Sequence, residues 1–519
     1  MKKKSFKKPL KILAKKLDLD NQPQFNEKSN QKEIGLKKQK ISRSYKQNLE
    51  ILKDLYSVPI NLDVSIREFT IRSLNRRAFI IYLATMTKVD YIQSGIMERL
   101  VENQDANRSI PDIVSSPVLK TAETIEDIVS AINLGSTALF VDGDMHCYLF
   151  GTTEIKSRGI EPSLNEVIVK GAKESFNEKA IDNVALIRKK IKNENLIVEL
   201  MDLSKRTRNH VYVVYEKDLV NEELLQTIKD KIDAIDVDSI PDLSILEQYL
   251  EERPRSLFPT ILYTERPDRA ASFIEEGHIV LLMDSSPGGL ILPATFWSLF
   301  HSPEDHYLRT PYGNFIRLLR VLALFVALFN SAFYIAVTNY HVGMLPPDLL
   351  MAIAGTRERV PFPSIVEVLL METAFELIRE AGLRVPSPVG PTIGIVGALI
   401  LGQAAVQANI ISPIIIIVVA LSGLSSFIII DVSMNFAIRL SRFLLILSAG
   451  FMGIYGVTAL FIFGIFYLVS LKSFGTPYFA PMTPHFFSSK DLIIRQVPMK
   501  ERFRPGYLKP KDMVKQRKG

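Results

Sequence analysis

Hydrophobic residues are distributed very unevenly along this chain. The residues before Arg317 mix apolar and polar positions as soluble domains do, whereas apolar residues dominate after it. Residues 392–430 contain no charged side chain, and this run is about twice the ~20 residues that cross a bilayer core. Pro413 interrupts the run, so the pattern predicts two helices with a tight break. The chain is therefore expected to be an integral membrane protein with a large soluble N-terminal region.

Apolar segments long enough to cross a membrane occur at residues 318–340, 392–410, 414–430 and 443–469. Arg317 and Arg320 begin the first segment, where they are expected to anchor it at the membrane interface.

Residues 363–382 are also apolar, but they carry charges. Glu372, Glu376, Arg379 and Glu380 share one arc of a helix at about 100° per residue. This segment is expected to be an amphipathic helix that lies at the interface or packs in the bundle, and a fifth crossing is the alternative.

Helix-like and strand-like patterns alternate in the soluble region, which favours an α/β fold. The helical patterns cover residues 45–55, 89–100, 180–192, 221–235 and 243–252, and the strand-like runs cover 78–84, 138–141, 147–150, 196–203, 210–215, 278–283 and 290–292.

The predicted fold class is a multi-domain α/β soluble N-terminal region followed by an α-helical transmembrane bundle of four to five helices. The expected divisions are a basic disordered tail (1–48), two soluble α/β subdomains (49–155 and 156–310), a transmembrane helical domain (311–471) and a basic cytoplasmic tail (472–519).

Positive charge is concentrated at the two ends of the chain, whose formal net charge is +7. Basic segments that flank membrane helices tend to stay on the cytoplasmic side, so both termini and the soluble domain are expected there. This arrangement requires an even number of crossings, and with four it leaves Arg439 and Arg442 on the outer side. Nucleic-acid binding is the rival explanation for basic tails, but the adjacent apolar segments favour membrane lipid, and no nucleic-acid partner is expected.

Candidate chemistry in the soluble region is sparse. Cys147 is the single cysteine, so no disulfide can form within the chain. His301, Glu304, Asp305 and His306 form a metal-like cluster in the sequence, but phosphate-loop, zinc-protease and nucleophile-elbow motifs are missing. The chain is therefore expected not to be an enzyme, with no catalytic residue, no metal and no cofactor.

A set of motifs spans most of the chain. They include Val360-Pro361-Phe362-Pro363, Arg379-Glu380-Ala381-Gly382-Leu383-Arg384, Gly402-Gln403-Ala404-Ala405-Val406 and Ser473-Phe474-Gly475-Thr476-Pro477-Tyr478. These motifs resemble the A subunit of bacterial spore germinant receptors, the GerA family, over roughly residues 45–507. Many members have glycine after Asp284, where this chain has Ser285.

The resemblance implies a subunit that works with a transporter-like B subunit and a lipoprotein C subunit in the spore inner membrane. It further implies a homo-oligomer that forms a ligand-gated ion-conducting path, whose opening triggers spore germination. The soluble domain and both termini would then face the spore core. A non-conducting scaffold or signal-transducing subunit is the main alternative, and a solute transporter is another.

The segment 392–410 has two different faces. Small residues on one face let helices approach closely in lipid: Gly394, Ala398, Gly402 and Ala405. The pore-lining candidates are Val396, Leu399, Gln403, Val406, Gln407 and Ile410. Amide side chains in lipid need polar partners, so Gln403 and Gln407 are expected to face a pore or to hydrogen-bond to neighbouring helices.

Three charged residues are candidates for gating or for ion pairing: Glu367, Glu372 and Arg384. Glu367 lies away from the acidic arc of its helix, and Arg357, Arg359 or Arg384 could pair with it.

Overall fold

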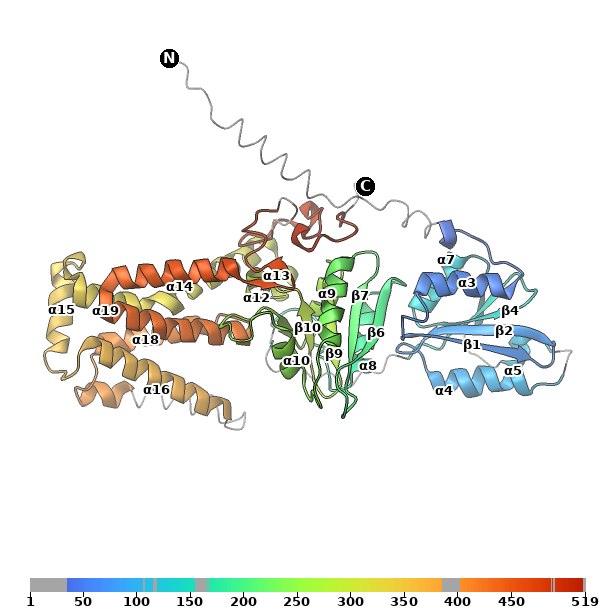
Figure 1. The fold of residues 1–519 in the computed structure, drawn as a ribbon, viewed down its shortest axis with the longest axis horizontal. Coiled ribbons are helices and arrows are strands. Elements are labelled where there is room, and N and C mark those ends of the chain that lie inside the picture. Colours follow the sequence, from blue (N-terminus) through green and yellow to red (C-terminus); the bar gives the residue numbers. More distant parts are fainter. Residues whose placement is uncertain are drawn as a thin grey trace, which may run out of the picture.

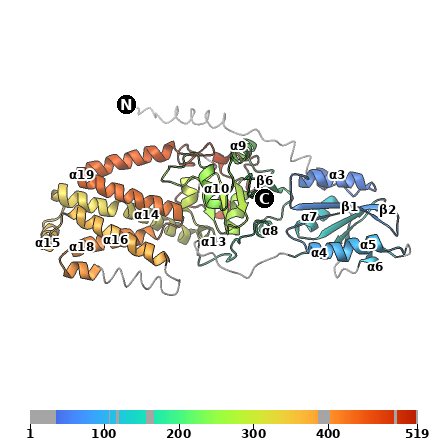
Figure 2. The same cartoon turned by 60° about the horizontal axis from the view of Figure 1, so that its bottom comes forward.

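The computed structural model describes residues 35–105, 108–114, 119–154, 166, 168–384, 402–486, 488 and 491–516. The molecule is elongated, with one α/β subdomain at one end, a second in the middle and a helical bundle at the other end (Figure 1). The rotated view in Figure 2 shows the same order. The C-terminal segment returns to the middle of the molecule, beside the second subdomain (Figure 1).

The first subdomain is a five-stranded sheet in the order β1-β2-β4-β5-β3, and its described pairings are all antiparallel. Alternate residues of β2 enter opposite cores: Phe79 and Ile81 contribute to one, Ile80 and Tyr82 to the other. Helices α3 and α7 cover one face, and the helical run from α4 to α6 covers the other (Figure 1). The strands are β1 (Val64–Ile71), β2 (Arg76–Leu83), β3 (Leu119–Ala122), β4 (Thr137–Val141) and β5 (Cys147–Phe150); the helices are α3 (Tyr45–Tyr56), α4 (Val89–Tyr91), the π-helical η1 (Ile92–Met97), α5 (Glu98–Glu102), α6 (Ile110–Ile113) and α7 (Ile125–Asn133).

The second subdomain has the order β6-β7-β9-β10-β8, which repeats the strand order of the first. Its described pairings are also antiparallel. Helices α8 and α11 pack in one core, and α9 and α10 pack in the core on the other face. The strands are β6 (Leu196–Asp202), β7 (His210–Glu216), β8 (Leu262–Thr264), β9 (Ile279–Met283) and β10 (Gly289–Leu292); the helices are α8 (Ala180–Lys190), α9 (Glu222–Asp233), α10 (Leu243–Leu250), α11 (Pro267–Ile274), α12 (Phe296–Phe300) and α13 (Glu304–Tyr307).

A buried ion pair joins the two subdomains. The Nε of Arg188 lies 2.9 Å from the Oδ2 of Asp63, and both side chains are fully buried. Beside this pair, the backbone N–H of Leu62 donates to the carbonyl of Val198 at 2.9 Å. The first subdomain is thus hydrogen-bonded to edge strand β6 of the second.

Five helices with described bounds form the bundle. Its own core contains Ala332, Val368, Ile415 and Leu445. A second core runs from the soluble subdomain into the bundle and includes Trp297, Ala327 and Met434. The helices are α14 (Thr310–Tyr340), α15 (Pro347–Arg357), α16 (Ser364–Arg384), α18 (Pro413–Ser426) and α19 (Val432–Ser470), with the short 3-10 turn η2 (Val342–Met344) after α14.

Within the described residues, two helices are long and apolar enough to cross a membrane: α14, with 31 residues, and α19, with 39. A bundle of four to five spans is therefore not confirmed. The predicted span at 392–410 lies largely outside the described residues. The predicted span at 414–430 is wrong in its length, because α18 has 14 residues and ends at Ser426. The Nδ2 of Asn435 donates to the Ser426 carbonyl at 2.7 Å, which satisfies a backbone group that a longer helix would have bonded internally.

The C-terminal segment is fastened to the second subdomain by its own hydrogen bonds. The hydroxyl of Ser473 donates to the carbonyl of Thr260 at 2.6 Å and accepts from the N–H of Ala294 at 3.1 Å. Arg495 donates from Nη1 to the carbonyls of Asp305 and His306, each at 3.2 Å. Its elements are β11 (Lys472–Ser473), β12 (Thr476–Pro477), η3 (Pro498–Lys500) and η4 (Gly506–Leu508).

Candidate functional site

Residues 402–410 are the described part of the segment 392–410, and residues 402–407 are helical. A Cβ at Gly402 would lie 3.8 Å from the side chain of Ile416 in α18, so this buried glycine faces that helix. Ala405 is half-buried and packs against the bundle core. Gly402 and Ala405 therefore face inward. Gly394 and Ala398 lie outside the described residues.

The opposite face of the same segment points outward. Gln403 and Gln407 are exposed, Ile410 is 42% exposed, and Val406 is half-buried. One chain thus presents two amides, one helical turn apart, on the outside of its bundle. The remaining pore candidates, Val396 and Leu399, lie outside the described residues.

A charged cluster occupies the interior of the bundle between α16 and α19. The Nη2 of Arg442 lies 3.0 Å from a carboxylate oxygen of Glu372 and 3.0 Å from one of Glu376. The Nε of Arg439 donates to Glu376 at 3.0 Å. Arg442 and Glu372 are fully buried. The charged arc of α16 therefore packs inside the bundle. Its acids pair with Arg439 and Arg442, the two arginines that four crossings would leave on the outer side.

Hydroxyl groups extend this cluster to α14 and α18. Ser331 donates to Glu372 at 2.7 Å and lies 3.1 Å from the hydroxyl of Ser422. Arg379 donates to the hydroxyl of Ser426 at 2.9 Å. Four helices thus meet at one polar network, which specifies how they pack against one another.

Glu367 sits apart from that network. Its carboxylate accepts from the N–H of Ser412 at 2.9 Å, at the N-terminus of α18, and lies 3.7 Å from the Nε of Arg357. Of the three arginines expected as partners, the structure therefore places Arg357 beside it. Arg384 ends α16, and its side chain is outside the described part.

Helix α19 is broken at Gly453, whose φ of 60° and ψ of −141° are not helical. The break frees backbone groups, and the end of α14 supplies partners for them. The hydroxyl of Tyr340 donates to the carbonyl of Gly450 at 2.5 Å, and the N–H of Ile454 donates to the Nε2 of His341 at 3.4 Å. A neighbouring helix thus satisfies groups that would be costly to leave unpaired in lipid.

The start of α14 is tied to the soluble part by a second buried charge cluster. Asp305 accepts from Arg320 at 2.9 Å and from Arg317 at 3.1 Å, and all three side chains are buried. Arg317 also pairs with Asp491 of the C-terminal segment. The expectation that these arginines anchor the helix in lipid headgroups is wrong, because their charges are matched inside the protein. Sequence reasoning missed this cluster, although two arginines at the edge of an apolar run were its signal.

The metal-like cluster of the sequence is not assembled as a metal site. His301 lies 2.5 Å from the carbonyl of Leu492 through Nε2, and Asp305 is engaged by arginines. Burial lowers the pKa of His301 to about 4, and Arg317 adds to this effect. Among the described residues, no group of three or more His, Cys, Asp or Glu could hold a metal ion.

Comparison with known proteins matches most of the chain to one family. The model of the Bacillus/Clostridium GerA spore germination protein family matches residues 50–507. Spore germination protein KA of Bacillus subtilis (strain 168) is 36% identical over 488 residues, covering 92% of this chain and 89% of that protein. Spore germination protein B1 of the same organism is 34% identical over 488 residues, covering 92% of this chain and 100% of that protein. The chain therefore belongs to the GerA spore germination protein family.

A solved structure also matches the soluble part. It is the N-terminal domain of the A subunit of the Bacillus megaterium spore germinant receptor GerK3, which is 25% identical to this chain. The match covers 50% of this chain and 98% of that one, with a TM-score of 0.39.

Membership in this family and the two long apolar helices together indicate a membrane-associated protein of spore germination. Both helices carry large exposed apolar side chains, among them Leu322 (59%) on α14 and Phe463 (67%) on α19. Large exposed apolar surfaces mark membrane or protein interfaces.

Proposed function

We propose that this chain is the A subunit of a nutrient germinant receptor and that several copies together form an ion-conducting path in the spore inner membrane. Opening of the path would release cations and start germination. The nutrient itself would bind to another subunit, and this chain would respond to it.

The observation that carries the proposal is the pair of outward amides, Gln403 and Gln407. An amide in contact with lipid loses its hydrogen bonds to water, which costs several kcal/mol. The packing of Gly402 and Ala405 fixes the helix so that both glutamines leave the bundle on the same side. Copies arranged around an axis would bring these amides together around water.

The interior of one bundle is a poor place for the path. Its carboxylates are already paired, since Arg442 and Arg439 neutralise Glu372 and Glu376. Its remaining space is filled by packed side chains such as Ile415 and Ile446. A conduit between copies, lined by the outward face of residues 402–410, fits these facts better than one through a single chain.

The proposed orientation follows from charge. Basic residues after the last apolar helix belong on the cytoplasmic side, which in a spore is the core. The described C-terminal segment is docked on the second subdomain, so both would lie on that side together. The partners would be a transporter-like B subunit and a lipoprotein C subunit, as in the family, in contact with membrane lipid. No enzymatic activity is proposed.

The test is ion flux through liposomes that contain the purified chain, alone and together with its B and C subunits. Gln403→Leu and Gln407→Leu should each lower cation flux by about tenfold. Each replaces the hydrated amides around the path with apolar side chains, which expel water from it. Thr458→Ala is the matched control, since this exposed hydroxyl on α19 bonds only its own helix and its removal should leave flux unchanged. Flux that is equal in all variants would exclude the glutamine face, and the lack of any flux in assembled complexes would favour a non-conducting scaffold.

A further inference from the structure

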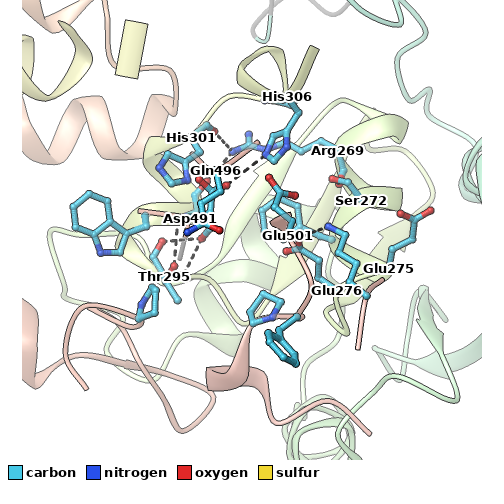
Figure 3. A pocket seen from close by; sticks show the side chains of 18 of the residues that line it. Arg269, Ser272, Glu275, Glu276, Thr295, His301, His306, Asp491, Gln496 and Glu501 are labelled. Carbon is cyan, nitrogen blue, oxygen red and sulfur yellow. Dashed lines mark hydrogen bonds and ion pairs between the residues drawn. The ribbon is translucent and has the colours of Figure 1, made fainter. Parts of the chain in front are cut away.

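A cavity of about 700 Å³ lies between the second subdomain and the C-terminal segment. Side chains reach it from α11, from the turn between α12 and α13, and from residues 491–515 (Figure 3). Its volume falls within the range of ligand sites for small molecules. It is remote from the outward glutamine face and has no part in the conduction argued above.

Five acidic and four basic residues line the cavity. The acidic residues on its wall are Asp268, Glu275, Glu276, Asp491 and Glu501, and the basic residues are Arg269, Lys500, Arg502 and Lys515. Arg269 is already engaged, because it pairs with Glu166 and donates to the carbonyls of Ser298 and His301 at 2.9 and 3.0 Å. His301 is neutral near pH 7, since burial lowers its pKa to about 4.

One of these acids, Glu276, has a single basic residue beside it among the described residues. Glu276 is near Lys515, at 3.4 Å, and keeps 28% of its side chain accessible. Burial raises the pKa of Glu276, Asp491 and Glu501 raise it further, and Lys515 offsets only part of the rise. Such a carboxylate gains from a positively charged partner that enters the cavity.

Two buried polar atoms on the wall also lack a partner among the residues that the structure describes. They are the Oδ1 of Asp268 and the Nε1 of Trp297, and each side chain is 8% exposed. The other oxygen of Asp268 is used by Arg266 at 2.7 Å and by Tyr307 at 2.5 Å. The carboxylate oxygen of Asp268 requires a hydrogen-bond donor, and the indole N–H of Trp297 requires an acceptor. Leaving either group unpaired costs about 1–3 kcal/mol.

Aromatic rings complete the wall. Phe273, Trp297, Tyr307, Phe503 and Tyr507 line the same cavity. Carboxylates combined with aromatic faces are the surroundings in which proteins bind ammonium groups.

We propose that this cavity binds a small organic cation, with a protonated amine for the carboxylates and a short body that carries a hydrogen-bond acceptor for Trp297. The site is coupled to the membrane part through Asp491, which lines the cavity and pairs with Arg317 in the first apolar helix. The proposal that a cation binds here rests on the cavity alone. An effect of binding on ion flux rests in addition on the proposed function.

Trp297 is the single tryptophan of the chain, so its fluorescence reports on this cavity without a label. The full-length chain in detergent is titrated with three probes of similar size: phenethylamine, its neutral analogue 2-phenylethanol, and the anion 3-phenylpropanoate. The proposal predicts a saturable change with phenethylamine and affinities weaker by about tenfold or more for the other two, the worth of one charge-assisted hydrogen bond.

Two variants locate the response, and both retain the reporter. Glu276→Gln and Asp268→Asn should each weaken phenethylamine binding by about tenfold. Glu223→Gln, an exposed acid on α9, is the control and should bind as the wild type does. Asp268→Asn also removes a charge beside Arg266. If Asp268→Asn folds poorly, the affinity of Glu276→Gln for phenethylamine is the decisive measurement.

Three results would overturn the proposal: no saturable response to phenethylamine, an equal response to all three probes, or wild-type affinity in Glu276→Gln. Because this experiment measures no ion flux, its failure would leave the proposed function standing. A failed flux experiment would likewise leave the binding site standing.

Discussion

Arg442 of α19 and Glu372 of α16 form an ion pair of 3.0 Å inside the helix bundle, and neither side chain reaches the surface. The pair joins two helices far apart in the sequence. Removal of one partner from such a pair costs about 3–5 kcal/mol, because the other charge stays buried without compensation.

Arg442→Leu is therefore expected to lower the thermal midpoint of the purified chain strongly. The double variant Glu372→Leu with Arg442→Leu should recover much of the loss, because it buries no lone charge at that point and leaves Glu376 with Arg439. Thermal unfolding followed by circular dichroism measures both. A double variant less stable than Arg442→Leu alone would contradict the account.

Ser285 has a φ of 70°, in the left-handed region that favours glycine. Its N–H donates to the carbonyl of Glu178 at 2.7 Å, which holds the strained conformation in place. Ser285→Gly is expected to raise the free energy of unfolding of the soluble region by about 0.5–1 kcal/mol.

The adjacent Ser286→Gly gives the opposite sign and serves as a control in a denaturant titration. The hydroxyl of Ser286 donates to Asp242 at 2.8 Å and accepts from the N–H of Leu243 at 3.0 Å, so its loss should destabilise. A loss of stability in Ser285→Gly would show that the positive φ costs nothing there.

Gly453 permits the break in α19. A Cβ there would lie 2.9 Å from the Cβ of Tyr340, and its φ and ψ belong to a region that only glycine enters readily. Gly453→Ala is expected to cost about 1–3 kcal/mol from backbone strain alone, and more from the clash. Gly464→Ala, in the same helix with nothing within 4 Å of the added carbon, should be neutral. The yield of monodisperse protein in size-exclusion chromatography distinguishes the two, and equal yields would contradict the assigned break.

Glu216 gives the soluble region a predictable response to pH. Burial raises its pKa to about 7 and Asp218 adds to the rise, although the amide of Asn193 donates to it. The unfolded chain loses this proton near pH 4.5, so the folded state holds the proton more tightly between pH 4.5 and about 7. The contribution of Glu216 to the free energy of unfolding is therefore complete below pH 4.5. It declines by about 3 kcal/mol in all as the pH rises from 4.5 to about 7.

Glu216→Gln should therefore flatten the fall in unfolding free energy between pH 4.5 and 7 and should stabilise the protein above pH 7. Urea titrations at several pH values measure the slope. An unchanged slope in the variant would place the ionisation elsewhere.

Local patterns in the sequence predicted local structure well. The strand-like runs predicted at 138–141 and 147–150 are strands β4 and β5, which pair across Asp142-Gly143-Asp144. Strand β1 was missed, since most of its residues are partly or fully exposed and its pattern is weak until β2 pairs with it. The strand-like runs predicted at 278–283 and 290–292 likewise form the paired strands β9 and β10.

The sequence did not predict which residues far apart in the chain contact one another. Arg317 was predicted as an interfacial anchor because it borders an apolar run, yet one of its partners, Asp491, is 174 positions away. The acidic arc of α16 was visible in the sequence, but its partners on α19 were assigned to the outer side of the membrane. The two faces of the segment around Gln403 were predicted from spacing, and the structure places Gly402 and Ala405 inward and the amides outward.

The most direct test of the central claim is whether water reaches Gln403 and Gln407 inside the assembled receptor. Cys147, the single native cysteine, is buried, so Gln403→Cys and Gln407→Cys can be read with a membrane-impermeant thiol reagent in a Cys147→Ser background. Phe463→Cys, on the exposed apolar side of α19, is the control that should face lipid. We predict rapid labelling at both glutamine positions after nutrient triggering and little at 463. Glutamine positions that stay as unreactive as 463, at rest and after triggering, would contradict a water-filled path along this face.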